Sequence, residues 1–399
     1  MLNPVFSINH MRHMTPIFYQ TAHRLCKAIN GQIKNSGSKE IDMLNWMGRT
    51  ALELVGQGGL GYSFDPLVAD TQNSFGEAIK AFLFGTPSLR RRLVELFPDP
   101  NVQALKKIID TMESRAKEIL ESKRAALRAG DAAVEQQVGE GKDIMSILLK
   151  SNMATDSADR LTEEELVAQM STLVFAATDT TSNGLSRILD LLTTHKDVQE
   201  KLRAEILEAG QGQDISYDQL VELPYLDAVC RETLRLYPPV PFVYRETRKD
   251  MVLPLSQPVE GLDGTALNEI VVPKDTLIFV SIRSCNRNKA IWGEDALEWK
   301  PERWLSSAPA ALQDAKIPGV YANLMTFLGG GNSCIGFKFS QLEMKVILAG
   351  LLSNFDFNPT DKEVYWNNSD VVYPTAGPDN SKASMPLTVQ PISNAPVSV

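Results

Sequence analysis

Several features are scarce in this chain, and each shortage excludes a class of protein. Four cysteines and four histidines in 399 residues are too few for a disulfide-stabilised scaffold, and neither type falls at metal-ligand spacing. Lysine and arginine total 40 against 49 acidic residues, a net charge of −9, which argues against a nucleic-acid partner. No apolar stretch approaches the about twenty residues that a transmembrane helix needs.

The residues that are abundant predict a large helical protein. Hydrophobic residues make up 43% of the chain, enough for a sizeable core. Helical patterns dominate through residue 236, and no linker rich in Pro, Gly or Ser divides the chain, so we expect one domain over residues 1–399. Residues 248–283 alternate in polarity around an Asp263-Gly264 turn, which predicts strands. The expected fold is mainly α with a small β region.

A glycine-rich loop near the C-terminus presents one cysteine just ahead of an amphipathic helix. It runs from Phe327 through three consecutive glycines to Cys334 and Gly336. The glycines let the backbone approach a planar ring, Phe327 offers an aromatic face, and Gly336 permits a sharp turn. The start of the helix should lower the pKa of the thiol and keep the sulfur ionised. This favours a cysteine that ligates a flat metal cofactor, with a buried cysteine after a turn as the alternative.

A long helix is predicted over residues 162–194. Thr162 and Glu165 have the spacing of a capping box, and apolar residues recur at helical spacing past Leu192. A helix of this length measures about 50 Å, enough to cross a large domain. Its uncharged stretch ends at Thr178 and is too short to span a bilayer.

The same helix contains a polar group where an apolar core would ordinarily continue. Ala176 and Ala177 leave room for a ring system, and Asp179 and Thr180 follow them. A threonine hydroxyl can donate to the carbonyl one turn back, which loosens the helix and admits water. Small residues, then an acid, then an alcohol suit proton delivery to bound oxygen. A solvated polar notch is the alternative.

Glu232 and Arg235 lie three residues apart on one face of a helix that ends before three prolines. On a surface, such a pair contributes only about 0.2–0.5 kcal/mol to the stability of the helix. The downstream sequence Pro301-Glu302-Arg303-Trp304 supplies a further cation. If the three charged side chains are buried together, removal of one leaves an uncompensated buried charge. This costs about 3–5 kcal/mol of folding stability.

These four motifs occur in the order found in the cytochrome P450 family, which the chain resembles over nearly its whole length. The resemblance implies the cytochrome P450 fold without its N-terminal portion, haem b as cofactor, and Cys334 as the ligand to iron. It also implies that Asp179 and Thr180 are the acid and alcohol of the oxygen-activation motif. Glu232, Arg235 and Arg303 would form a structural ion cluster. The other positions expected around the haem are Phe327, Gly330, Gly336, Asn332, Arg245, Ala176 and Ala177.

The resemblance further implies a haem-thiolate monooxygenase that inserts one oxygen atom from O₂ into an apolar organic substrate. Its electron donor would be a flavoprotein reductase or a cytochrome. Two alternatives stay open: a non-catalytic haem-binding remnant, and a haem-thiolate peroxygenase or isomerase. Intact family members of this type sit on the cytosolic face of the endoplasmic reticulum membrane. This chain is expected to lack the anchor and to be cytoplasmic.

Three positions bear on departures from the family pattern. The start, from Met1 to Phe6, resembles family sequence that follows the membrane anchor and first helices, so these are expected to be absent. Asn332 stands where an arginine or histidine usually reaches a haem propionate, and a neutral amide gives a weaker hydrogen bond. Arg245 is the candidate that supplies the missing cation to the propionate. The alternative is that Arg245 is an ordinary exposed residue of a strand.

Two further patterns carry alternative interpretations. Gly56 to Gly61 satisfies the dinucleotide fingerprint Gly-x-Gly-x-x-Gly, but residues 41–55 predict a helix where that fingerprint needs a strand, so helix termination by glycine is preferred. Lys338 and Lys345 would share a helix face on the cysteine side of the cofactor. An acidic electron donor could dock on these two lysines. The alternative is that they belong to an ordinary solvent-exposed helix face.

Overall fold

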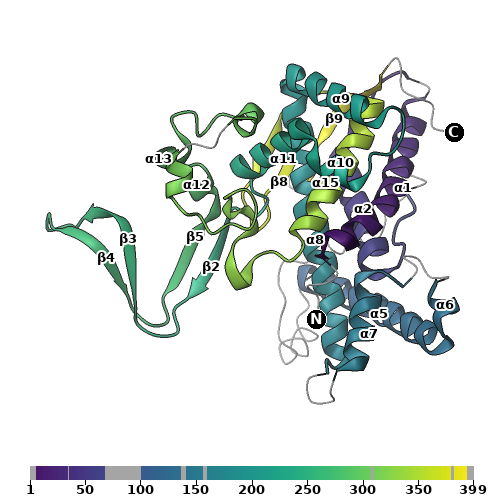
Figure 1. Ribbon diagram of the computed structural model, residues 1–399, viewed down its shortest axis with the longest axis horizontal. Helices are drawn as coiled ribbons and strands as arrows, with labels where there is room; N and C mark the ends of the chain where they lie inside the picture. Colours follow the sequence, from purple (N-terminus) through teal and green to yellow (C-terminus); the bar gives the residue numbers. More distant parts are fainter. Residues whose placement is uncertain are drawn as a thin grey trace.

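The computed structural model describes residues 6–34, 36–67, 100–135, 141–155, 160–306, 310–378 and 382–392. Most of them are helical (Figure 1). The α-helices are α1 Ile8–Ile33, α2 Met43–Leu54, α5 Pro100–Ala129, α6 Asp131–Glu135, α7 Ile144–Ala154, α8 Glu163–Thr194, α9 Lys196–Gly210, α10 Tyr217–Glu222, α11 Pro224–Leu236, α12 Ile282–Asn286, α13 Lys289–Trp292, α14 Ala310–Asp314 and α15 Phe337–Asn354. A π-helix, η2, spans Val55–Leu60, and the 3₁₀ helices are η3 Pro301–Trp304, η4 Met325–Phe327 and η5 Gly330–Asn332.

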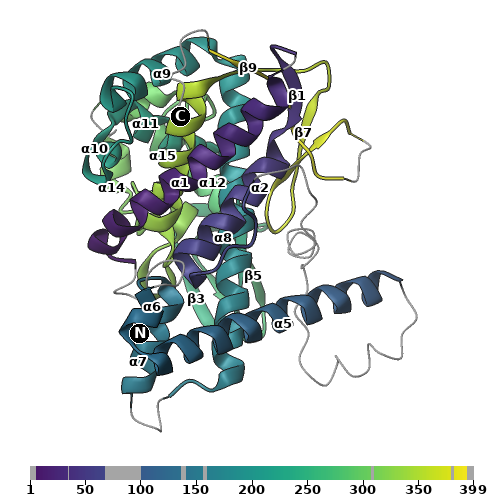
Figure 2. The same ribbon diagram turned by 90° about the vertical axis from the view of Figure 1, so that its right-hand side faces the viewer.

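The long helix α8 begins where the sequence predicts. Thr162 Oγ1 accepts a hydrogen bond from Glu165 N, and the Glu165 carboxylate accepts one from Thr162 N, which completes the predicted capping box. The helix continues for 32 residues and is about 48 Å long. It runs through the middle of the molecule, where α2, α5, α11 and α15 pack against it (Figures 1 and 2).

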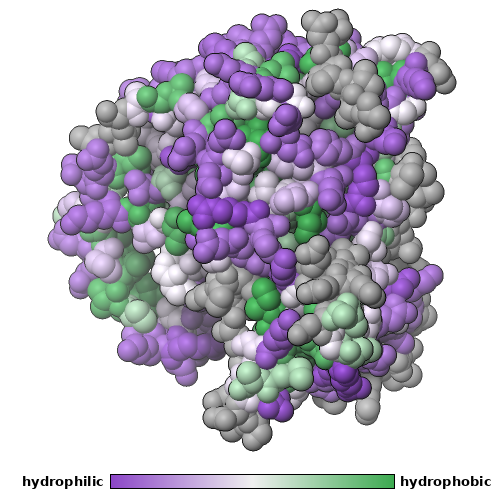
Figure 3. All heavy atoms as spheres, turned by 45° about the vertical axis from the view of Figure 1, so that its right-hand side comes forward, coloured by the Kyte–Doolittle hydropathy of each residue, from purple (hydrophilic) through white to green (hydrophobic). Residues whose placement is uncertain are grey.

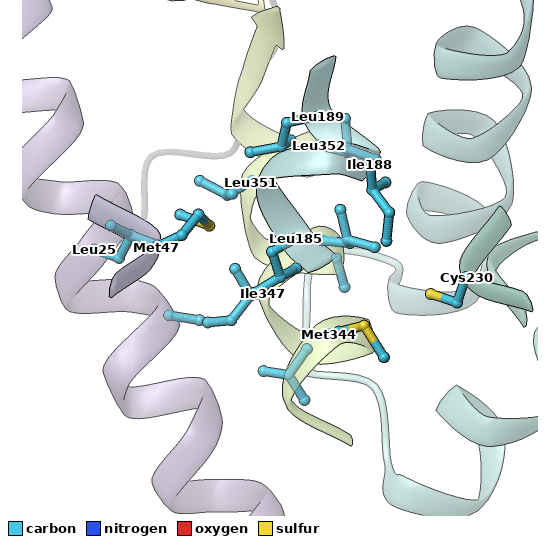
Figure 4. Close-up of a cluster of buried hydrophobic side chains, with 14 of the residues drawn as sticks. Leu25, Met47, Leu185, Ile188, Leu189, Cys230, Met344, Ile347, Leu351 and Leu352 are labelled. Carbon is cyan, nitrogen blue, oxygen red and sulfur yellow. The ribbon is translucent and has the colours of Figure 1, made fainter. Parts of the chain in front are cut away.

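The main hydrophobic core surrounds the second half of α8. Figure 4 shows side chains of α1, α2, α8 and α15 in this core, among them Leu25, Met47, Leu185 and Ile347. All four are 0% exposed, and burying each contributes about 1.5–3 kcal/mol. The helix that follows the cysteine loop is therefore anchored directly to α8.

A second core cluster covers the first half of α8. It contains Met112 and Ile119 of α5, Leu148 of α7 and Met170 of α8. Figure 2 shows α5 crossing near that end of α8. These contacts fix the start of α8 independently of the cysteine loop.

The strands form small antiparallel sheets, in the orders β1-β9-β6, β2-β5, β3-β4 and β7-β8. Their bounds are β1 Lys39–Asp42, β2 Phe242–Glu246, β3 Met251–Glu260, β4 Ala266–Val272, β5 Leu277–Ser281, β6 Phe355–Asn358, β7 Val364–Asn367, β8 Tyr373–Ala376 and β9 Pro386–Pro391. The predicted β region is confirmed by β3, β4 and β5, and Gly264 has a φ of 81° at the predicted turn. The β2-β5 and β3-β4 pairs extend away from the helical body (Figure 1).

The glycine run after α2 does not have the context of a nucleotide site. It continues α2 as the π-helix η2 and ends at Gly61, whose φ of 58° is left-handed. The run follows a helix rather than a strand, so the prediction of helix termination is confirmed. A Cβ at Gly56 would lie 2.6 Å from the Tyr62 carbonyl oxygen, which explains why glycine stands there.

No helix in the described ranges is long and apolar enough to cross a bilayer. The face drawn in Figure 3 carries mostly polar side chains, with separate apolar groups between them. The expectation that an N-terminal part is absent is based mainly on residues 1–5. These residues lie outside the described residues.

Candidate functional site

Backbone hydrogen bonds close the loop that carries Cys334. The Cys334 amide donates to the Phe327 carbonyl oxygen at 2.9 Å, so the two ends of the glycine run meet. Gly330 has a φ of 67°, a conformation that glycine adopts without steric cost. A Cβ at Gly329 would lie 1.9 Å from the Pro318 carbonyl oxygen. The run therefore also lets the loop pack closely against the protein's own chain.

Cys334 faces an apolar cavity of about 110 Å³, called here the Cys334 cavity. One wall is the cysteine loop with the start of α15, and another is α8. Its lining residues are Phe6, Val55, Ile144, Leu173, Ala176, Ala177, Thr180, Thr181, Phe327, Cys334, Ile335, Gly336, Phe339 and Ser340.

The polar group of α8 borders this cavity. Ala176, Ala177 and Thr180 line it, and the Thr180 hydroxyl donates to the Ala176 carbonyl oxygen at 2.8 Å, one turn back as the sequence predicts. Asp179 is half-buried and is not among the lining residues. Asn183 Nδ2 donates to the Asp179 carbonyl oxygen at 2.8 Å and approaches its carboxylate at 3.4 Å. The acid and the alcohol thus occupy neighbouring faces of one turn.

The sequence predicts that the pKa of the Cys334 thiol is lowered, and for the thiol without a bound metal this prediction is wrong. Burial raises the pKa of Cys334 above its ordinary value, and the hydrogen bond from the Gly336 amide only partly opposes this. The physical reason is that an apolar cavity removes hydration from the thiolate, which outweighs one backbone dipole. A metal cation bonded to the sulfur reverses that balance, because coordination deprotonates a thiol outright.

The predicted ion cluster is present and buried. Arg235 Nε and Nη2 donate to the two Glu232 carboxylate oxygens, each at 2.8 Å, and both side chains are 0% exposed. Arg303 Nε approaches the same carboxylate at 3.3 Å and pairs with Asp295 at 2.8 Å. Trp304 Nε1 donates to Glu232 at 3.0 Å. The surface-pair alternative therefore does not apply, because these charges are removed from water.

The cluster is linked to the cysteine loop by residues that the sequence motifs do not include. Arg235 Nη1 donates to the Asn286 carbonyl oxygen at 3.0 Å. The Asn286 side chain, in turn, donates to Thr326 Oγ1 and accepts from the Met325 amide, both at 2.9 Å. Thr326 immediately precedes Phe327, whose carbonyl oxygen holds the Cys334 amide. No spacing predicts this, since Asn286 and Thr326 are 40 residues apart.

Gly330, Arg245 and Asn332 do not line the Cys334 cavity, and neither does Lys345. Arg245 is exposed on β2 and donates to the Tyr244 carbonyl oxygen at 2.8 Å. Asn332 is exposed in η5. Lys345 does not share an exposed face with Lys338: it is 2% exposed and pairs with Asp227 at 2.8 Å. The predicted docking role of Lys345 is wrong, because α10 and α11 cover this part of α15.

The sequence model of the cytochrome P450 family matches residues 1–377. The chain belongs to this family. It is 54% identical to cytochrome P450 monooxygenase 219 of Postia placenta, over 98% of this chain and 75% of that protein. It is 51% identical to ganoderic acid synthetase CYP5150L8 of Ganoderma lucidum, over 98% of this chain and 76% of that protein. A crystal structure of a cytochrome P450, CYP102L1, matches with a TM-score of 0.73 and 25% identity, covering 98% of this chain and 77% of the other.

This cytochrome P450 is an oxidoreductase of the monooxygenase class, and its family takes haem b as cofactor. The predictions of family and fold are confirmed, and the chain spans about three quarters of the length of these relatives. The cavity fits the cofactor in its chemistry: one thiol opens into an apolar space whose α8 wall includes Ala176 and Ala177. Small side chains there leave room for a flat ring between α8 and the cysteine loop.

Proposed function

We propose that this cytochrome P450 inserts one oxygen atom from O₂ into an apolar organic substrate. The observation that carries the proposal is the Cys334 cavity, where a single thiol lies with Thr180 of α8 around one apolar space. A thiolate supplies electron density to a bound iron, and an alcohol on the neighbouring helix can handle protons. The low polarity of the other lining residues suits an apolar substrate and excludes bulk water.

Cys334 is the proposed iron ligand, and Phe327, Gly330 and Gly336 shape the loop around it. When bound, the haem supplies the oxygen and redox chemistry. Ala176 and Ala177 would lie against its ring. Asn332 and Arg245 remain proposed contacts for the propionates, and both are exposed before any such contact is made.

Thr180 and Asp179 are the proposed proton-handling groups. The Thr180 hydroxyl proton is directed to the Ala176 carbonyl oxygen, so Thr180 Oγ1 keeps lone pairs that accept a hydrogen bond from water in the cavity. Asp179 lies one residue away and is half-buried, so its carboxylate can exchange protons with water and pass them toward the Thr180 hydroxyl. General acid catalysis of this kind contributes about 10²–10⁴-fold in rate.

The reaction needs a redox partner, and we propose a flavoprotein reductase or a cytochrome. We further propose that residues 1–399 form one catalytic domain. We also propose that the enzyme acts at the cytosolic face of the endoplasmic reticulum membrane. Ganoderic acid synthetase, by its name, forms ganoderic acid, so precursors of that acid are reasonable first substrates to screen.

Isotope labelling tests the proposal. The purified chain, loaded with haem and supplied with a reductase and NADPH, is incubated under ¹⁸O₂ with a panel of apolar compounds that includes precursors of ganoderic acid. One labelled oxygen atom per product molecule is expected, and Thr180→Ala should lower the product formed per NADPH consumed while Thr180→Ser largely preserves it. Product formed only with added peroxide, or carrying no label from O₂, would favour the peroxygenase or isomerase alternative instead.

A further inference from the structure

A second cavity, of about 200 Å³, lies beside the second half of α8. Its wall is built by α8, the turn after α11, α12 and the β7-β8 hairpin, and it shares no lining residue with the Cys334 cavity. Along α8 the two cavities are separated by Gly184, which packs against Pro239 and Met344. We call the second cavity the arginine pocket, defined by Arg187, Tyr237, Arg283, Arg287, Trp366 and Asn368.

Positive charge in the arginine pocket exceeds negative charge. Its lining in the described part of the chain contains three arginines and no carboxylate. Within the described ranges, only Arg187 of the three has an acidic partner. That acid, Asp190, lies 3.2 Å from Arg187 Nη1 and also accepts a hydrogen bond from Trp366 Nε1 at 2.8 Å. Arg283 and Arg287 therefore carry charges that no acid of the described residues neutralises through an ion pair.

Several guanidinium nitrogens at the pocket have no acceptor among the described residues. Arg187 donates from Nη1 alone. Arg283 donates only from Nη1, to the neutral Asn368 side chain at 2.8 Å. Arg287 donates from Nε and Nη2 to the Leu236 carbonyl oxygen, which leaves its Nη1 without an acceptor. Arginine N–H groups bind phosphate and carboxylate oxygens through charge-assisted hydrogen bonds, so this set of donors suits an oxyanion.

Aromatic rings and one amide hold these cations in place. The Arg187 guanidinium lies 3.9 Å from the centre of the Tyr237 ring and 4.3 Å from that of Trp366. Arg287 lies 5.1 Å from the centre of the Tyr237 ring. Such stacking stabilises an arginine without neutralising its charge. A ligand that binds here therefore does not have to order the arginine side chains first, which lowers the entropic cost of binding.

The three cations also repel one another. Burial lowers the pKa of Arg287, and the charges of Arg283 and Arg187 lower it further. The pKa of Arg187 is lowered as well, chiefly by burial. Both directions show that the protonated side chains are less favourable here than in water. An anion placed among them would offset this repulsion and the lost hydration together.

We propose that the arginine pocket binds a phosphate group, at a site separate from the haem cavity and additional to the proposed monooxygenase function. A phosphate group carries a charge of about −1.5 to −2 at pH 7 and presents three strong acceptor oxygens. It can therefore accept hydrogen bonds from Arg187, Arg283 and Arg287 together. A carboxylate has one charge and two oxygens, so it leaves more of these donors unpaired. Inorganic phosphate and a phosphate monoester share the chemistry that the pocket recognises.

Isothermal titration calorimetry on the haem-loaded chain, at constant ionic strength, tests the site. Inorganic phosphate, glycerol 3-phosphate and acetate are titrated into the wild type, Arg283→Gln and Arg283→Lys. The matched control is Arg248→Gln, which removes the same charge from a side chain that is 83% exposed. The wild type should bind phosphate saturably and about tenfold or more tightly than acetate. Arg283→Gln should weaken phosphate binding about tenfold or more, Arg283→Lys should weaken it less, and Arg248→Gln should leave it unchanged.

The absence of saturable binding by both phosphate compounds would overturn the proposal, as would equal affinity for acetate and phosphate or equal effects of Arg283→Gln and Arg248→Gln. The wild-type titrations decide the first two outcomes even if a variant does not fold. Tighter binding of glycerol 3-phosphate than of inorganic phosphate would uphold the site and assign it to a monoester, and the reverse order would uphold it for the free anion. Phosphate binding that depends on Arg283 in a chain that oxidises no substrate would uphold this site and refute only the proposed function.

Discussion

Replacing Arg235 by alanine should destabilise the protein far more than an ordinary ion pair would suggest. Arg235 makes hydrogen bonds to both Glu232 carboxylate oxygens and to the carbonyl oxygens of Asn286, Ala296 and Glu298. Its removal leaves the Glu232 charge fully buried, with Arg303 as the remaining cation at 3.3 Å. Breaking a buried pair from one side costs about 3–5 kcal/mol.

Urea unfolding followed by circular dichroism measures this cost. The control is Arg12→Ala, whose ion pair with Asp218 is solvent-exposed, with side chains 48% and 61% exposed, and should contribute little to stability. Arg235→Lys should lie between the two, because a lysine keeps the charge but loses the two parallel donors. A free energy of unfolding for Arg235→Ala within about 1 kcal/mol of the control would refute the reasoning.

The same variant should lose haem. Arg235 holds Asn286, and Asn286 holds the residues directly before Phe327, so the cysteine loop loses its support. The ratio of haem to protein absorbance after gel filtration measures the loss. A stable Arg235→Ala protein with full haem content would show that the cluster does not support the loop.

Three other predictions concern stability and cofactor retention. Burial raises the pKa of Glu343 well above its ordinary value of 4.5, so the folded state keeps a proton that the unfolded chain loses, and stability should fall as pH rises past that value. Glu343→Gln should remove this fall as the pH rises above 4.5, measured by urea midpoints; an unchanged pH dependence would contradict it. Gly56→Ala should cost about 1–3 kcal/mol through overpacking, whereas Gly31→Ala, with open space around it, should stabilise α1 by about 0.5–1 kcal/mol; similar melting shifts for both would contradict this. Asn332→Arg should slow haem transfer to apomyoglobin by adding a cation near the propionates, and an unchanged rate would show that Asn332 does not limit retention.

Local patterns in the sequence predicted those parts of the fold that depend on neighbouring residues. The capping box at Thr162, the bond from Thr180 to the carbonyl one turn back and the turn at Gly264 all lie within a few residues of chain. The Glu232–Arg235 pair belongs with them, since its partners share one helix face.

Features that depend on tertiary packing were not predictable in this way. The burial of Lys345 arises because α10 and α11 cover α15. The link from Asn286 to Thr326 joins segments far apart in sequence. The pKa of Cys334 depends on how much apolar surface surrounds the thiol, which no loop sequence specifies.

The central claim, that Cys334 ligates the haem iron, is tested most directly by the carbon monoxide difference spectrum of the reduced, haem-loaded chain. The wild type should show the strongly red-shifted Soret band of a thiolate-ligated haem, and Cys334→Ser should lack it while retaining the same circular dichroism spectrum. A wild-type band characteristic of nitrogen ligation, or a red-shifted band that persists in Cys334→Ser, would contradict the claim.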